Sequence, residues 1–214
     1  ILKNMNKLRK YLNSFYFKIS KYSQAGQDIF AHELFGERGT YIDVGAGHPV
    51  KFSNTYMLEV NKRWKGFGLE IGHPNPVKKQ LHKDLWNSYP ERKNKIYWQD
   101  ALTFDYKKGL IENDLDSNID FLSCDLDPAK NTFAALQKII NDGVRPKFIS
   151  FETDLYQEKI DYSLLAYNFL KPYGYKIAVS DVYSSLKKNK IFETWFVISS
   201  INFESVSYSK WVKK

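Results

Sequence analysis

Hydrophobic residues along the chain form short runs that are separated by segments with helical spacing. The first run, residues 41–44, contains a single acid and is followed at once by glycines. A short apolar run that ends in turn residues is typical of a buried strand. Four further runs of this kind follow, at residues 65–70, 96–99, 119–124 and 147–151.

Between these runs, apolar residues recur at intervals of three or four, which predicts helices. The predicted helices are residues 29–35, a helix from residue 56, a helix from about Pro76 to residue 85, and residues 129–141 and 162–170. Residues 104–118 are polar and poorly periodic, so we expect a loop with a short helix there.

Strands that alternate with helices at this spacing predict an α/β fold, with a parallel sheet and helices on both faces. Two more apolar runs, residues 175–179 and 191–198, are separated by a loop at 183–189 and predict an antiparallel hairpin. Each of the first five strands ends in an acid or a glycine turn. Because ligands bind at the carboxyl ends of such strands, the sequence predicts a site along that edge.

The turn after the first strand contains Asp43, Gly45, Ala46 and Gly47. Glycine lets the backbone pass close to a bound ligand, and Asp43 can hold the turn or bind a polar end of the ligand. A glycine turn between any strand and helix can give the same pattern. The turn alone therefore leaves both interpretations open.

Acids at the next two strand ends extend this pattern toward an adenosine ligand. Glu70 ends the second strand, where a carboxylate can accept two hydrogen bonds from a ribose diol. Asp100 follows the third strand and can accept from an adenine amino group, while the N–H of Ala101 can donate to a ring nitrogen. A solvated acid at a strand end is the alternative for Glu70.

Pro49 separates two classes of adenosine cofactor. A dinucleotide fingerprint needs a third glycine and bare N–H groups at a helix start, which bind the pyrophosphate. Here the third glycine is missing, and Pro49 removes one N–H. The sequence therefore favours S-adenosylmethionine over NAD.

Acids after the fourth and fifth strands are the candidates for chemistry. Methyl transfer from S-adenosylmethionine requires alignment of the acceptor atom and usually removal of its proton. We expect Asp125 to act as general base or acceptor-orienting group, with Asp127 and Glu152 in support. The alternatives are that Asp127 caps the next helix and that Glu152 pairs with a lysine. With Asp154, these carboxylates would also suit Mg²⁺, but the sequence favours a site without a metal.

The chain resembles the FkbM family of S-adenosylmethionine-dependent methyltransferases, over roughly residues 22–198. The segments that carry the resemblance are Ser-Gln-Ala-Gly-Gln-Asp at 23–28, Tyr-Ile-Asp-Val-Gly-Ala at 41–46, Phe-Ser-Asn-Thr at 52–55, Trp-Lys-Gly-Phe-Gly-Leu-Glu at 64–70 and Ile-Asp-Phe-Leu-Ser-Cys-Asp-Leu-Asp at 119–127. The resemblance implies a Rossmann-like class I methyltransferase sheet and O-methylation, often of sugars in secondary metabolites or surface polysaccharides. It adds Asn54 to the cofactor-binding residues. Gln24 and Gln27 precede the first strand. We expect them to fold over the cofactor mouth, and a helix-capping turn is the alternative.

Three positions depart from the family pattern. Residues 71–73 intervene between the second-strand acid and Pro-Asn-Pro, Pro128 follows Asp127 where the family has glycine, and Thr153 stands where the family commonly has histidine. The missing histidine argues against a histidine-based mechanism at the end of the fifth strand. These departures also leave open a non-catalytic binding module with a methyltransferase fold.

The net charge of the chain bears on the chemical class of its binding partner. The chain has 214 residues, with 32 lysines and arginines against 24 acids, which gives a formal net charge of +8. The excess can reflect a lysine-rich proteome, or it can indicate an acidic glycan, a nucleic acid or a membrane surface. An RNA methyltransferase is therefore the alternative enzyme, although the lysines form no dense patch in the sequence. We expect a small-molecule or glycan acceptor.

Three segments are expected along the chain: a basic N-terminal helical extension at 1–21, a methyltransferase domain at 22–200 and a tail at 201–214. The extension has apolar residues near helical spacing and suits either packing on the domain or weak contact with a membrane surface. The single cysteine, Cys124, excludes an internal disulfide and fits a cytoplasmic protein.

Overall fold

The computed structural model describes residues 22–155, 159–183, 191–203 and 206. Its strands are β1 (Thr40–Val44), β2 (Lys65–Leu69), β3 (Lys95–Tyr97), β4 (Phe121–Cys124), β5 (Phe148–Glu152), β6 (Tyr175–Tyr183) and β7 (Ile191–Ile198). Its helices are α2 (Gln27–Phe35), α3 (Tyr56–Lys62), α4 (Pro76–Asn87), α5 (Tyr106–Glu112), α6 (Ala129–Asn141), α7 (Tyr162–Leu170) and the 3₁₀ turn η1 (Lys171–Tyr173).

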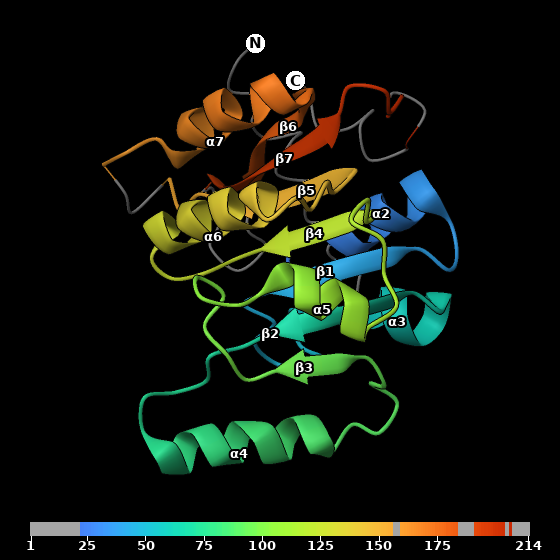
Figure 1. Ribbon diagram of the computed structural model, residues 1–214, viewed down its shortest axis with the longest axis vertical. Helices are drawn as coiled ribbons and strands as arrows, with labels where there is room; N and C mark the ends of the chain where they lie inside the picture. The colour runs from blue at the N-terminus through green and yellow to red at the C-terminus, as the bar shows by residue number, and fades with distance from the viewer. Residues whose placement is uncertain (1–21, 156–158, 184–190, 204–205, 207–214) are drawn as a thin grey trace.

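The seven strands form one sheet in the order β3-β2-β1-β4-β5-β7-β6 (Figure 1). Strands β1 to β5 are parallel, whereas β7 runs antiparallel to both β5 and β6. This confirms the predicted Rossmann-like sheet with a C-terminal hairpin. The carboxyl ends of the parallel strands consequently meet at one edge.

Helices cover both faces of the sheet, and the strand residues alternate between them. Ile42, Leu122 and Ile149 belong to one buried cluster, together with residues of α5, α6 and α7. Tyr41 and Phe121 belong to the other cluster, together with residues of α2 and α3. Figure 1 shows α5, α6 and α7 in front of the sheet and α2 and α3 behind it.

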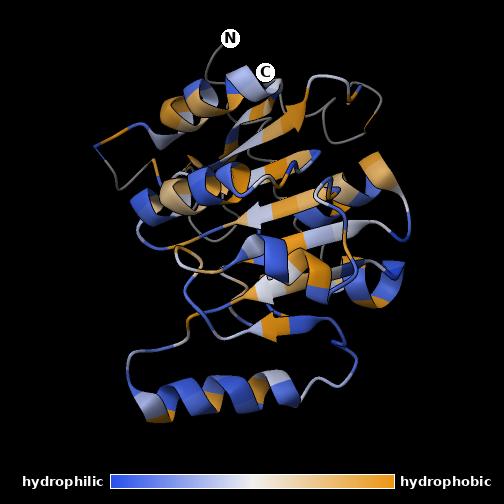
Figure 2. Ribbon diagram, in the orientation of Figure 1, coloured by the Kyte–Doolittle hydropathy of each residue, from blue (hydrophilic) through white to orange (hydrophobic). Residues whose placement is uncertain are grey.

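Helix α4 lies apart, along the edge beyond β3, and is mostly hydrophilic (Figure 2). It begins where Asn75 accepts hydrogen bonds from the N–H groups of Val77 and Lys78, with Pro76 at the first helical position. Trp86 is its one buried residue, and the indole donates to the carbonyl of Gly47 at 2.9 Å. The helix is thus fixed to the turn after β1.

Strand boundaries differ from the prediction at several places; β4, for example, was expected from Ile119 and begins at Phe121. The third strand was expected at 96–99 but ends at Tyr97, because the chain turns at Asp100, whose carbonyl accepts from the N–H groups of Thr103 and Phe104. Strand β6 extends to Tyr183, which was expected to lie in the hairpin loop. The predicted N-terminal extension lies outside the described residues, as does most of the predicted tail. Among the described residues, no helix combines the length and hydropathy needed to span a membrane.

A buried ion pair connects the segment between α4 and β3 to α3. The guanidinium of Arg92 lies 2.8 Å from the carboxylate of Glu59, and both side chains are almost fully buried. Glu59 also accepts from the hydroxyl of Tyr41 and from the N–H groups of Lys93 and Asn94. Each oxygen of this carboxylate is therefore paired, which is what makes a buried charge tolerable.

We expect Arg92→Ala to lower the free energy of unfolding by about 3–5 kcal/mol, because the Glu59 carboxylate loses its buried counter-charge. Lys65→Ala is the matched control, since its pair with Asp114 is exposed on both sides and should contribute no more than about 1 kcal/mol. Urea unfolding of both variants measures the difference. Equal losses would contradict a central role for the buried pair.

Candidate active site at the carboxyl edge of the sheet

The turn after β1 lies directly against the ends of β2 and β4. The N–H groups of Gly45 and Ala46 both donate to the carbonyl of Leu69 at 3.0 Å. Gly45 has a φ of 80°, and a Cβ there would lie 1.8 Å from the carbonyl oxygen of Asp125. Only glycine suits this position, for its conformation and for its contact.

Glu70 joins the turns after β1 and β2. Its two carboxylate oxygens accept from the N–H of Gly47 at 2.9 Å and from the N–H of Gly72 at 2.7 Å. A carboxylate offers about four lone-pair sites, so further acceptor capacity remains on this half-buried side chain. The carboxylate can therefore still accept hydrogen bonds from a ribose diol, and this contact stays a prediction.

Asp43 and Asn54 lie in the interior beside β4. The hydroxyl of Thr55 donates to Asp43 at 2.7 Å. Burial raises the pKa of Asp43, while this hydrogen bond lowers it to a smaller extent. The amide of Asn54 donates to the hydroxyl of Ser123 at 3.1 Å. Its buried carbonyl oxygen has no hydrogen-bond partner in the described part of the chain. Asp43 thus holds the turn, and Asn54 offers an acceptor.

The two predicted glutamines differ in their surroundings. Gln27 is fully buried; its amide donates to Glu193 at 2.8 Å and its carbonyl accepts from the N–H of Ala25 at 2.9 Å. Its contacts are therefore with the protein interior. Gln24 is half-buried and precedes α2. For both residues, contact with a cofactor stays a prediction.

Asp100 and Ala101 form the turn after β3, as the sequence pattern indicates. The side chain of Asp100 accepts from the N–H of Leu102 at 2.8 Å, and Ala101 is buried with its carbonyl bonded to the hydroxyl of Tyr106. The N–H of Glu70 donates to the carbonyl of Tyr97, so the ends of β2 and β3 are in register. The predicted adenosine residues after β1, β2 and β3 therefore line consecutive strand ends.

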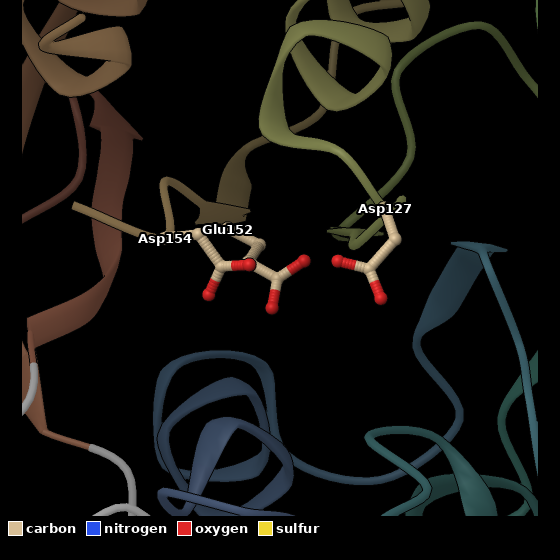
Figure 3. A group of neighbouring side chains, drawn as sticks. All are labelled: Asp127, Glu152 and Asp154. Atoms are coloured by element: carbon tan, nitrogen blue, oxygen red, sulfur yellow. The ribbon is translucent and has the colours of Figure 1, made fainter. Parts of the chain in front are cut away.

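Acids gather where β4 and β5 end. Asp125 and Glu152 are hydrogen-bonded to each other. The carboxylates of Asp127, Glu152 and Asp154 point toward one another, with ligand oxygens that all lie within 4.8 Å (Figure 3). Glu152 and Asp154 are buried, whereas Asp127 is exposed. The structure thus brings the three predicted catalytic acids together with a fourth.

Burial is the main cause that raises the pKa of both members of the Asp125–Glu152 pair. The hydrogen bond between them lowers the pKa of Asp125 and raises that of Glu152. The pair accordingly holds a proton on Glu152, which donates to Asp125. The bond that Asp125 accepts favours its ionised form and opposes the effect of burial on its pKa.

The sequence analysis did not single out Glu193. This acid lies directly opposite Glu152 in the antiparallel pair of β5 and β7 and is 1% exposed. It accepts from Gln27 and from the indole of Trp195, and burial raises its pKa to about 8. The sequence feature that could have indicated Glu193 is its position as the one acid in a largely apolar predicted strand, residues 191–198.

Two histidines support the turn after β1. The ring of His48 accepts from the N–H groups of Val50 and Lys51 through Nδ1, each at 3.0 Å. Nε2 of His82, on α4, lies 2.7 Å from the carbonyl of Gly47. His48 therefore organises the loop in which it lies, and His82 fixes that loop from outside.

Solved structures with the same fold are methyltransferases and related enzymes. The METTL16 methyltransferase domain has a TM-score of 0.56 and 14% identity, over 83% of this chain and 67% of that one. An rRNA methylase from Streptococcus thermophilus has a TM-score of 0.51 and 12% identity, over 81% and 95%. Protein Sp1610 of Streptococcus pneumoniae, solved with S-adenosyl-L-methionine, has a TM-score of 0.50 and 12% identity, over 82% and 73%. The fold is that of class I methyltransferases.

Identities this low establish the fold and no more. The spermidine synthase of Thermotoga maritima shares the fold as well, with a TM-score of 0.54 and 12% identity. No protein-family model matches the chain, and neither does any curated protein sequence. Membership of the FkbM family therefore stays a prediction.

We expect Gly45→Ala to destabilise the protein by about 2–4 kcal/mol, since it combines left-handed strain with a clash against Asp125. Gly143→Ala is the matched control: Gly143 has a φ of 94°, but no atom lies within 4 Å of its added Cβ. It should cost about 1–2 kcal/mol, which is the conformational part alone. Thermal or urea unfolding compares the stability losses of the two variants. Equal losses would contradict a close contact between residue 45 and the carbonyl of Asp125.

Stability should fall as the pH rises from 4.5 to about 8, because folded Glu193 retains a proton that the unfolded chain releases over this range. Glu193→Gln removes this titration and should flatten the dependence. Glu37→Gln, at a mostly exposed acid, should leave it unchanged. Urea unfolding across this pH range tests the effect. A variant as pH-dependent as the wild type would contradict it.

Proposed function

We propose that the protein is an S-adenosylmethionine-dependent methyltransferase. The observation that carries the proposal is the link from Glu70 to Gly47, which places an acid at the end of β2 beside the glycine turn of β1. In a class I methyltransferase fold, these turns flank the place for an adenosine. S-adenosylmethionine supplies a methyl group on a sulfonium centre that is already activated for displacement.

The acids beyond β4 and β5 suit a hydroxyl acceptor. Asp125 would orient the acceptor oxygen and take its proton. Glu152 holds the proton of the pair and donates to Asp125, so Asp125 can still act as a proton acceptor. Burial raises the pKa of Asp125 toward neutral pH, and a general base is most effective when its pKa lies near the working pH. With the resemblance to the FkbM family, this supports O-methylation of a sugar or glycan.

An RNA acceptor is the second candidate, because several solved structures of this fold carry the names of RNA methyltransferases and the net charge is +8. The local charge opposes it. Asp125 and Asp127 lie at the edge where an acceptor would enter, and their negative charges would repel a phosphate backbone. A neutral hydroxyl avoids this cost, which favours the glycan acceptor.

Purified protein should bind S-adenosylmethionine and its demethylated product, as calorimetry measures. Glu70→Ala should weaken binding about tenfold to a hundredfold, the value of hydrogen bonds from a diol to a charged acceptor. Glu37→Ala, at a mostly exposed acid, is the control and should bind as the wild type does. Absence of binding by the wild type would overturn the proposal.

The acceptor class needs separate measurements. Transfer of labelled methyl to a glycan would exclude a non-catalytic binding module. A salt-sensitive gel shift with short RNA would favour the second candidate, and no shift at low salt would count against it.

A further inference from the structure

Three carboxylates from two neighbouring strand ends converge on one point beside the candidate active site. Asp127 follows β4, Glu152 ends β5, and Asp154 follows two residues later. Each offers one oxygen, and these oxygens lie within 4.8 Å of one another (Figure 3). Asp154 has a positive φ of 42°, which turns the chain at this place.

One oxygen of this cluster is buried and unpaired. Glu152 is only 8% exposed, and its Oε2 has no hydrogen-bond partner in the part of the chain that the structure describes. The same side chain points toward Asp127 and Asp154 (Figure 3). A buried carboxylate oxygen loses its hydration without compensation unless an ion or a water molecule occupies the place beside it.

Ordinary structural roles do not account for these acids. The N-cap of α6 has no side-chain hydrogen bond, so Asp127 does not cap that helix. Within the described residues, Glu152 forms no ion pair with a lysine or arginine. Glu152 also lies opposite Glu193 in the sheet, where a like charge is unfavourable. The cluster therefore gathers carboxyl groups that these contacts leave without a counter-charge.

We propose that Asp127, Glu152 and Asp154 form a binding site for a divalent cation of the Mg²⁺ and Ca²⁺ class. All three ligands are carboxylate oxygens, which these hard cations prefer. Oxygens that surround such a cation at about 2.0–2.6 Å lie up to about 5 Å apart, which matches the observed spacing. Because Asp127 is exposed, water or an acceptor can complete the coordination shell.

The site also has a consequence for the reaction, and that consequence rests on the proposed function. A cation held here would lie next to Asp125, through its bonded partner Glu152. It would bind neighbouring hydroxyl oxygens of a sugar and ease loss of their protons.

Calorimetric titration of the chelator-treated full chain with MgCl₂, CaCl₂ and MnCl₂, without cofactor, tests the site. We expect saturable binding of at least one of these cations by the wild type. Asp127→Asn and Glu152→Gln should each lower the affinity by at least about tenfold to a hundredfold. Asp127→Asn changes an exposed residue, so loss of folding cannot explain its effect. Asp116→Asn, at an exposed acid before β4, is the matched control and should bind as the wild type does.

Absence of binding at millimolar cation, or equal affinity in wild type and Asp127→Asn, would overturn the site. Because cofactor is absent from these titrations, either result is independent of S-adenosylmethionine binding.

Discussion

The shape of the candidate site depends on the buried charge pair between Arg92 and Glu59. The same guanidinium donates to the carbonyl of Pro49 and to the hydroxyls of Ser53 and Thr55. Thr55 donates in turn to Asp43, at the end of β1. One desolvated arginine therefore holds the whole loop between the glycine turn and α3. Such a charge is stable only because every partner in the network is polar and in place.

The acceptor side of the site is organised by the opposite charge. Asp125, Glu152 and Glu193 lie after β4, at the end of β5 and in β7, where the surrounding protein raises the pKa of all three carboxyl groups. Two of them lie directly opposite each other in the sheet. A fold optimised for stability alone would place apolar residues there, so the acids indicate a binding or catalytic demand. A shared proton and a divalent cation are two ways to relieve the same repulsion.

The two halves of the edge differ accordingly. At β1, β2 and β3, backbone N–H groups and Glu70 form a compact turn that suits a neutral nucleoside. At β4 and β5, carboxylates dominate and suit a cationic centre, a metal ion or a hydroxyl that must lose a proton. This division is consistent with a donor and an acceptor that meet above the ends of β1 and β4, where Gly45 touches Asp125.

The sequence by itself determined the fold class, the strand positions and the acids at the strand ends, because these follow from hydrophobic periodicity and turn residues, which are local properties. The short third strand and the long β6 were misjudged, since hydrogen bonds at Asp100 and pairing with β7 set those ends. Only the tertiary structure revealed the Arg92 network, the contacts of His82 and Trp86 with Gly47, and the pairing of Glu152 with Glu193. These contacts join residues that are distant in the chain, and no local pattern encodes which buried charge will meet which partner.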